Sequence, residues 1–417
     1  LGDVYKRQDL LFMLKKCSAM ILALTLAVSV FASCAEKNES SSKTENSSSL
    51  SEIDSSVDST AEVPVASLTV DGEKVDTENL IVCTIDGIDV DFDTFRYYYF
   101  YTINLYTKNY GATLDVISQT EGGFELLMND VITQLKQEYV TLHLCKENDI
   151  ELDEEDNKFV EETIASAKKN YKTEEEYQEA LKSSYLTDDL YKRMVELSRL
   201  YEKVESTLFT NGGKYATTKE EFRKIVKDTD KYARVRQILI PYQCKAEITD
   251  EDTKKNYDDM TLSEKMTAKK SAFSDLSEEE QKASKEEAKK LAEEVLDKAK
   301  SGEDFDKLIK EYGWDPGMET YEQGYYMNRN SNFVDEFKNA GFKLKENEIS
   351  DLVESTEYGW FIIKRLPVDM DYVEKNIDSL IVEYDSPAVS KLYSEIMEKM
   401  EVSYNDIYEK LTPQSIT

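Results

Sequence analysis

The stretch from Ala292 to Leu366 reads AEEVLDKAKSGEDFDKLIKEYGWDPGMETYEQGYYMNRNSNFVDEFKNAGFKLKENEISDLVESTEYGWFIIKRL, and its patterns decide the fold of the middle of the chain. Apolar residues recur at helical spacing over residues 292–299, and the Ser-Gly pair that follows ends this helix. A second short apolar face runs over residues 305–309. The stretch therefore begins with two predicted helices.

The second half of the stretch changes its pattern. Glycine and proline residues at positions 313–317 interrupt the helical period. A third helical stripe follows and contains Phe333, Phe337 and Phe342. The apolar run 360–363 and an upstream run, 235–240, are both typical of buried strands. Together these elements predict a small α+β domain whose first and last strands pair.

Four of these segments resemble the parvulin family of peptidyl-prolyl isomerases. They are VRQILI in the first strand, SGEDFDKLIKEYGWDPG in the second helix and its turn, FVDEFKNAGFKLKENEIS in the third helix, and YGWFIIK in the last strand. They cover most of residues 231–367 in the order that the family has. With an export signal before it and helices on both sides, the chain resembles the PrsA/SurA-type extracytoplasmic foldase lipoproteins.

The resemblance implies a site for X-Pro bonds that needs neither a nucleophile nor a cofactor. Amide resonance opposes rotation of the X-Pro bond with a barrier of about 20 kcal/mol, and a site lowers it by binding the twisted bond better than the planar one. By resemblance, Phe333, Phe337 and Phe342 line or support an apolar socket for the proline ring, and Asp315 takes a polar position at its rim.

Three positions depart from the family's pattern. Gln237 and Phe361 stand in the first and last strands where the family commonly has histidines, and Gln323 stands where an apolar pocket residue is expected. Gln237 is still able to donate a hydrogen bond to Asp315. Two interpretations stay open. The domain is an active isomerase, with Asp315 and Gln237 as catalytic residues and Phe361 and Gln323 among the substrate-binding ones, or it is weakly active or inactive and binds chains.

The amino-terminal segment has the pattern of an export signal. Met13 is the predicted start, two lysines at positions 15 and 16 precede an apolar run over residues 21–31, and small residues lead to Cys34. The sequence FASC resembles a bacterial lipobox, which implies a lipidated Cys34; cleavage at an ordinary secretory site nearby is the alternative. Residues 35–65 are polar and lack aromatics, so a flexible tether is expected.

Ordered structure is expected from about Leu80. An Asp-Gly pair at positions 86 and 87 predicts a tight hairpin over residues 81–90. Helices are expected at 92–110, 123–148, 154–171, 173–184, 187–210 and 218–227. A long helix at 386–400 and a short strand from Val402 are expected to return to this hairpin and pair with it.

The predicted fold class is α+β, with a mostly helical chaperone module that the C-terminal helix completes and that carries an inserted parvulin-like domain. The predicted parts are residues 1–33 (upstream residues and signal peptide), 34–79 (lipidated cysteine and disordered linker), 80–230 (helical module), 231–367 (parvulin-like domain with a helical insertion at about 241–290) and 368–417 (C-terminal helix and strand).

Composition excludes several other classes. A net charge of -33 argues against nucleic acid, which needs a basic face. His143 is the only histidine, which excludes catalytic triads and multi-histidine metal sites, so no metal is expected. No nucleotide-binding glycine motif is present, and no cofactor is expected. Cys83, Cys145 and Cys244 form no CxxC pair, and their disulfide state is left open.

The sequence thus predicts an ATP-independent foldase on the outer face of the bacterial cytoplasmic membrane, anchored through Cys34. Its expected partners are unfolded or partly folded secreted proteins. The alternative from another class is a non-enzymatic holdase or interaction lipoprotein with a degenerate parvulin domain.

Overall fold

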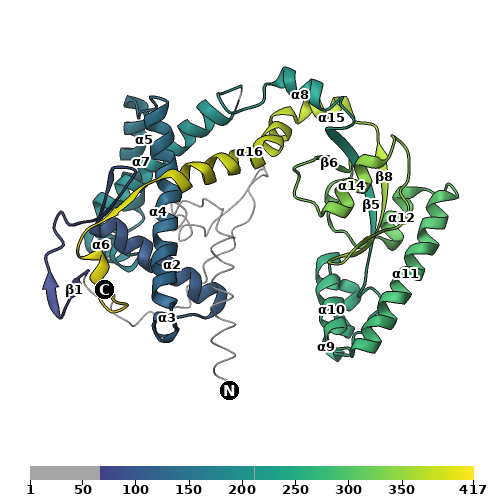
Figure 1. The fold of residues 1–417 in the computed structure, drawn as a ribbon, viewed down its shortest axis with the longest axis horizontal. Helices are drawn as coiled ribbons and strands as arrows, with labels where there is room; N and C mark the ends of the chain where they lie inside the picture. The colour runs from purple at the N-terminus through teal and green to yellow at the C-terminus, as the bar shows by residue number, and fades with distance from the viewer. Residues whose placement is uncertain (1–65, 211) are drawn as a thin grey trace. The chain divides into compact units, whose positions relative to one another are not determined.

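The computed structural model describes residues 66–210 and 212–417, and these residues form two compact units. One unit contains the described residues up to Thr207 together with Ser390–Thr417, and the other is Leu208–Val389. Figure 1 labels their helices and strands. The predicted signal peptide, Cys34 and tether lie outside the described residues. No helix of the described ranges is long and apolar enough to cross a membrane.

The first unit contains a three-stranded sheet of order β4-β3-β9. The predicted hairpin is present: β3 (Ile81–Ile85) and β4 (Ile88–Asp91) pair in antiparallel fashion around a turn in which Asp86 and Gly87 have φ angles of 53° and 74°. The predicted return of the C-terminal segment is also present, because β9 (Val402–Tyr404) pairs with β3. Backbone pairing thus joins segments more than three hundred residues apart.

The expectation that order begins near Leu80 is wrong. A second hairpin precedes it, formed by β1 (Leu68–Val70) and β2 (Glu73–Val75). Leu68 forms a β-bridge with Ile416, and these two side chains are 1% and 3% exposed. The strands are three residues long and mostly polar outside, and their apolar partner lies at the other end of the chain. Local sequence pattern therefore gave no signal for them.

The helices of the first unit follow the predicted ranges closely, except the short helix at residues 114–119, which the sequence did not predict. They are α2 (Phe92–Tyr110), α3 (Leu114–Gln119), α4 (Gly123–Glu147), α5 (Glu154–Lys169), α6 (Glu174–Ser183), α7 (Asp188–Val204) and the π-helical turn η2 (Glu205–Phe209). Side chains cap the first turns of several: Asp153, Thr173 and Thr187 each accept a backbone N–H of the helix that follows. On α2, Phe95, Tyr99 and Ile103 are buried and form its core face.

The second unit is built around a four-stranded antiparallel sheet of order β6-β5-β8-β7. Its strands are β5 (Tyr232–Pro241), β6 (Tyr325–Asn328), β7 (Val353–Ser355) and β8 (Gly359–Leu366). The predicted pairing of the first and last strands is confirmed over eight residue pairs, from Arg234 opposite Leu366 to Pro241 opposite Gly359. Alternate residues of the two central strands therefore face opposite sides of the sheet.

Each face of this sheet is covered by different helices. Ile238, Ile240 and Ile362 pack with buried residues of α11 (Glu278–Lys300) and α12 (Phe305–Tyr312). Val235, Leu239 and Phe361 pack with α14 (Asp335–Lys343) on the other face. Gln237 has the same parity as Val235 and Leu239, so it belongs to the α14 face. The strand period thus places Gln237 with the predicted socket residues.

Between β5 and α11 the chain forms α9 (Glu251–Asn256), the 3-10 turn η3 (Tyr257–Asp259) and α10 (Leu262–Ser274). Neither α9 nor α10 contains a buried residue. The ammonium group of Lys269 donates to the carbonyl oxygen of Ala246 at 2.6 Å, and Phe273 packs against the core of the unit. This helical segment is therefore attached through few residues and adds little to the core.

A third cluster lies where the chain enters and leaves the sheet. It combines α8 (Lys219–Ile225), α15 (Met370–Lys375) and the start of α16 (Ile377–Lys399), with Phe222, Tyr232 and Val373 at its centre. The sequence placed the start of the last helix at residue 386, which is wrong. Helix α16 begins nine residues earlier and continues through Pro387, which lies inside it. Burial of Ile377, Leu380 and Ile381 holds its first turns.

Candidate functional site

The site begins at the turn that follows α12. Gly313 ends this helix, and the sequence Asp315-Pro316-Gly317 forms a tight turn into the short helix α13 (Gly317–Thr320). The Oδ1 atom of Asp315 accepts the backbone N–H of Gly317 at 2.9 Å. The turn therefore fixes one oxygen of the carboxylate by a local hydrogen bond.

The other oxygen of Asp315 faces the sheet. Its Oδ2 atom accepts hydrogen bonds from the side-chain amide of Gln237 and from the hydroxyl of Tyr325, the latter at 2.8 Å. The hydrogen bond from Gln237 to Asp315, which the sequence allowed, is thus present. Gln237 is only 6% exposed, and its Oε1 atom has no hydrogen-bond partner among the described residues.

Tyr325 joins this polar group to the apolar part of the site. It is the first residue of β6, and its ring lies 5.0 Å from the ring of Phe333, centroid to centroid. Burial, and then the charge of Asp315, raise the pKa of Tyr325 well above its ordinary value. The hydroxyl therefore remains protonated and acts as a donor at neutral pH.

Aromatic rings continue from Tyr325 in a row. Ring centroids are 5.4 Å apart between Phe333 and Phe337, and 5.3 Å apart between Phe337 and Phe361. Tyr321 extends the row at the end of Tyr325, at 5.5 Å, and Tyr358 extends it at the end of Phe361, at 6.3 Å. We call these six residues the aromatic row. Phe337 and Phe361 are buried, Tyr325 and Phe333 are half-buried, and Tyr321 and Tyr358 are 53% and 41% exposed.

Two of the predicted site residues lie outside the aromatic row. Phe342 is buried, but its ring packs under the guanidinium groups of Arg329 and Arg365, at 4.0 and 5.8 Å. Gln323 is exposed, and its side-chain and backbone oxygens accept hydrogen bonds from Arg234. The structure thus brings Asp315, Gln237, Phe333, Phe337 and Phe361 together. Phe342 packs in the same buried cluster as Phe337 and Phe361, and Gln323 lies apart from this group.

Tyr325 and Met318 belong to the site although the sequence reading did not name them. Met318 is 3% exposed, and its sulfur accepts the backbone N–H of Gln237 at 3.5 Å. Tyr325 follows Gly324, whose φ is 87° and whose missing side chain leaves room for the carbonyl oxygen of Val235. A Gly-Tyr pair at the start of a strand was the only local signal, and it does not reveal the contact with Asp315.

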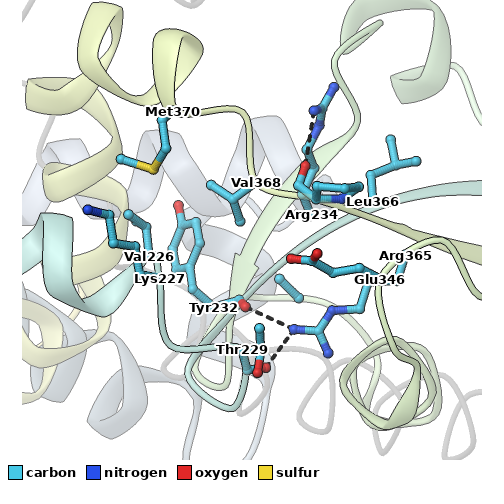
Figure 2. A pocket seen from close by; sticks show the side chains of 12 residues that line it. Val226, Lys227, Thr229, Tyr232, Arg234, Glu346, Arg365, Leu366, Val368 and Met370 are labelled. Atoms are coloured by element: carbon cyan, nitrogen blue, oxygen red, sulfur yellow. Dashed lines mark hydrogen bonds between the residues drawn. The ribbon is translucent and has the colours of Figure 1, made fainter.

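A separate cavity of about 190 Å³ lies at the other end of the sheet (Figure 2). Its lining comes from the end of α8, the start of β5 and the segment that follows β8, and it includes Val226, Tyr232 and Val368. Asp315 and the aromatic row do not line it. The cavity is therefore distinct from the predicted isomerase site.

Arg365 is the buried cation beside this cavity. Its Nη2 atom donates to the carbonyl oxygens of Thr229 at 2.6 Å and Tyr232 at 3.2 Å. Its Nη1 atom donates to those of Phe342 at 3.3 Å and Leu344 at 2.8 Å. Burial lowers the pKa of Arg365 from its ordinary value. Arg365 thus connects the loop before β5 and the beginning of that strand to the end of α14 by hydrogen bonds.

Other reactive groups do not form a site in the part of the chain that the structure describes. No cluster of three or more histidine, cysteine, aspartate or glutamate side chains is arranged to hold a metal there. His143 is paired with Asp86 at 2.8 Å and is partly exposed, not a core residue. Cys83, Cys145 and Cys244 are buried free thiols, and burial raises the pKa of Cys83 to about 12.

Comparisons with known proteins support the resemblance of the middle of the chain. Residues 273–367 match a family model described as "PPIC-type PPIASE domain". The foldase protein PrsA of Bacillus subtilis (strain 168) is 34% identical over 123 residues, which are 28% of this chain and 42% of that protein. The foldase protein PrsA of Caldanaerobacter subterraneus subsp. tengcongensis is 30% identical over 192 residues, 44% of this chain and 55% of that protein.

A solved structure titled as a peptidylprolyl isomerase (PrsA) from Bacillus cereus is also similar, with 18% identity over 77% of this chain and 90% of that chain, and a TM-score of 0.31. The chain spans about half the length, or less, of the curated relatives named above. The predicted resemblance to PrsA-type foldases, with a PPIC-type domain over residues 273–367, is thereby confirmed. The fold class is α+β, with one mainly helical unit and one unit built on the sheet.

Proposed function

We propose that this protein is an ATP-independent foldase that binds unfolded exported chains and catalyses cis/trans isomerisation of their X-Pro bonds. The observation that carries the proposal is the aromatic row beside the Asp315 carboxylate, to which Tyr325 of the row donates a hydrogen bond. Both lie inside the segment that matches a PPIC-type domain. The relatives named foldase protein PrsA support the same class of function.

The chemistry of the site fits bond rotation. Isomerisation requires only that the twisted imide is bound more tightly than the planar one. Half-buried Phe333 and buried Phe337 and Phe361 offer an apolar surface to a proline ring. Asp315 and Gln237 supply fixed polar groups beside it. We assign Asp315 and Gln237 the catalytic positions, and Phe333, Phe337 and Phe361 the substrate contacts.

The remaining sequence predictions about the site receive less specific roles. Phe342, near the end of α14, stabilises this helix through the contacts of its ring with Arg329 and Arg365. Gln323 stays a proposed contact for the client segments that approach Tyr321, because it is exposed two residues after that ring. Neither residue is assigned to the proline socket.

A non-enzymatic holdase is the second candidate. Gln237 and Phe361, at the positions where the family commonly has histidines, favour it. In that case the aromatic row binds X-Pro segments without accelerating their rotation, and the helical unit delays aggregation.

Location and domain plan belong to the same proposal. The lipobox-like sequence at Cys34 supports an anchor on the outer face of the cytoplasmic membrane, with residues 35–65 as a tether. A helical module that begins with β1 and ends near residue 230, the parvulin-like domain at 231–367 and the returning segment at 368–417 are its proposed parts. The net charge of -33 favours attraction of basic, unfolded clients over acidic ones.

The test compares the full chain with Phe337→Ala and Asp315→Ala variants. Cis-to-trans relaxation of a panel of X-Pro peptides is measured beside aggregation of an unfolded client. Acceleration by the wild-type chain that falls in both variants supports the isomerase. Delayed aggregation without acceleration of any peptide supports the holdase. A chain that does neither contradicts both.

A further inference from the structure

Asp315 accepts hydrogen bonds from three donors, and the sequence did not predict one of them. The local donor is the N–H of Gly317, and the donor from β5 is Gln237. The third donor is the hydroxyl of Tyr325 at 2.8 Å, from the edge strand β6. The hydroxyl and the Gln237 amide meet at the same oxygen, Oδ2.

We propose that Tyr325 is a positioning residue of the isomerase site, whose hydroxyl fixes the Asp315 carboxylate at the end of the aromatic row. This inference rests on the proposed function. It gives Tyr325 the task of orienting the polar rim in a chain that has glutamine and phenylalanine at the positions where related domains commonly have histidines.

The turn around Asp315 is shaped to admit this hydroxyl. A Cβ atom built on Gly317 would lie 1.8 Å from the oxygen of Tyr325 and 3.1 Å from Oδ1 of Asp315. Any side chain at residue 317 would therefore occupy the place of the hydroxyl. The φ angle of Gly317 does not require glycine, because Gly317 is not among the residues with positive φ. The space for Tyr325 accounts for the glycine.

The ring of Tyr325 couples the polar and apolar parts of the site. It contacts Phe333 on one side, at 5.0 Å, and Tyr321 on the other, at 5.5 Å. Since Phe333 in turn contacts Phe337, a proline ring bound on the row lies at a fixed place relative to the carboxylate. Such alignment acts on the reacting bond more than on the affinity for the planar ground state.

The Tyr325 hydroxyl stays protonated over the pH range in which the isomerase would be assayed. The ionisable groups that face Tyr325 are Asp315 on the turn and Tyr321 on the loop before β6, and both, together with burial, favour the neutral phenol. We therefore expect the orientation of Asp315 to persist from about pH 6.5 to about pH 9, where a histidine in the same role would change its charge.

The first test measures peptide isomerisation by Tyr325→Phe, Gly317→Ala and the double variant. Loss of one hydrogen bond to a charged group is expected to lower kcat by about tenfold. The KM is expected to stay within about twofold, because the ring and the row remain. The double variant is expected to be no slower than the single ones, since both remove the same contact. Tyr110→Phe, which removes an exposed tyrosine hydroxyl of the other unit, is expected to retain full kcat.

Three results would overturn the inference: a Tyr325→Phe variant with wild-type kcat, a rise in KM alone, or fully additive losses in the double variant. A second readout separates this inference from the proposed function. The side-chain amide signals of Gln237 are followed by NMR in the same variants. They are expected to shift in Tyr325→Phe and to stay in place in Tyr110→Phe.

Both readouts are needed because the two claims fail differently. If the wild-type chain accelerates no peptide while the Gln237 signals respond as expected, the enzymatic function fails and the role of Tyr325 in holding Asp315 stands. If the Gln237 signals do not respond to Tyr325→Phe, the positioning role is wrong whatever the activity.

Discussion

Phe337 and Phe361 meet edge to face, with ring centroids 5.3 Å apart and an angle of 61° between the ring planes. They are 2% and 5% exposed and connect α14 to the central strand β8. The position where related domains commonly have a histidine is therefore almost fully buried among apolar side chains in this chain. A polar side chain at residue 361 would lose its hydrogen bonds to water and gain none in the hydrophobic core.

Phe361→His is accordingly expected to destabilise the sheet-containing unit by about 2 kcal/mol or more and not to restore a faster isomerase. The volume-related control, Phe361→Leu, is expected to cost about 1.5 kcal/mol or less. Urea unfolding of both variants, followed by a signal from Trp360, measures the difference. A histidine variant as stable as the wild-type chain would show that residue 361 has access to water or to a polar partner.

Arg365→Met is expected to loosen the entrance of the sheet. It removes the four hydrogen bonds to the carbonyl oxygens of Thr229, Tyr232, Phe342 and Leu344. Leaving such groups unpaired costs about 3 kcal/mol or more. Hydrogen exchange should accelerate in peptides that cover residues 228–233 and 342–346. Arg329→Met is the matched control, because Arg329 also stacks on Phe342 but donates only to the carbonyl oxygen of Asp230. Equal effects of the two substitutions would contradict the prediction.

Asp156 is expected to make the packing of α5 on α7 sensitive to acid. The hydrogen bond from Lys203, and then that from Arg199, lower the pKa of Asp156 below its ordinary value. A carboxylate with a lowered pKa contributes stability that is complete above its unfolded-state pKa and is lost as the pH falls through the folded-state value. The protection factors of amides in residues 154–204, which correct for the slower intrinsic exchange in acid, should therefore fall as the pH is lowered below about 4.

The Asp156→Asn variant checks the cause. It should already exchange faster in this region at neutral pH and should lose most of the additional acid sensitivity. Glu162→Gln, which removes an exposed pair with Lys158, is the control and should behave as the wild-type chain. An unchanged acid response in Asp156→Asn would assign that response to other carboxylates.

The C-terminal strand is expected to protect the thiol of Cys83. This residue lies opposite Tyr404 in the pairing of β3 with β9 and is 1% exposed, and burial raises its pKa to about 12. A chain ending at Met400 lacks β9 and should be alkylated at Cys83 much faster, as measured by mass spectrometry.

The other cysteines are internal controls for this experiment. Cys244 lies in the other unit and should react at its slow rate in both chains. Cys145, on α4, should also remain slow if the helices of the first unit stay folded. Fast reaction of Cys145 would mean that the truncation unfolds the unit, and slow reaction of Cys83 would mean that β9 does not cover it.

The predictions from sequence were accurate wherever the determinants were local. The helix Phe92–Tyr110 was expected with those limits, because its apolar period is continuous and a glycine with a φ of 64° follows it. The Asp86-Gly87 turn identified the hairpin for a similar reason. The polar pair of Gln237 and Asp315 was anticipated only through resemblance to a family whose fold brings the two segments together.

The errors and omissions have a non-local cause. β1 is held by Ile416, and α16 tolerates Pro387 because tertiary burial fixes the turns before it. The role of Tyr325 depends on a turn ten residues earlier and on a glycine that makes room for its hydroxyl. Gln323 was expected in the socket but bonds Arg234, a contact that spans 89 positions of the sequence. None of these partners lies within one turn or one strand of the residue concerned.

The pairing of Arg234 with Leu366 places the beginning of β5 beside the end of β8. Neighbouring strands are about 4.8 Å apart, so the two ends of the sheet-containing segment lie side by side. A segment with adjacent ends needs no spacer and adds little closure entropy when it is spliced into another protein. Because the beginning of β5 and the end of β8 lie side by side, a host surface loop could accept this segment without being stretched.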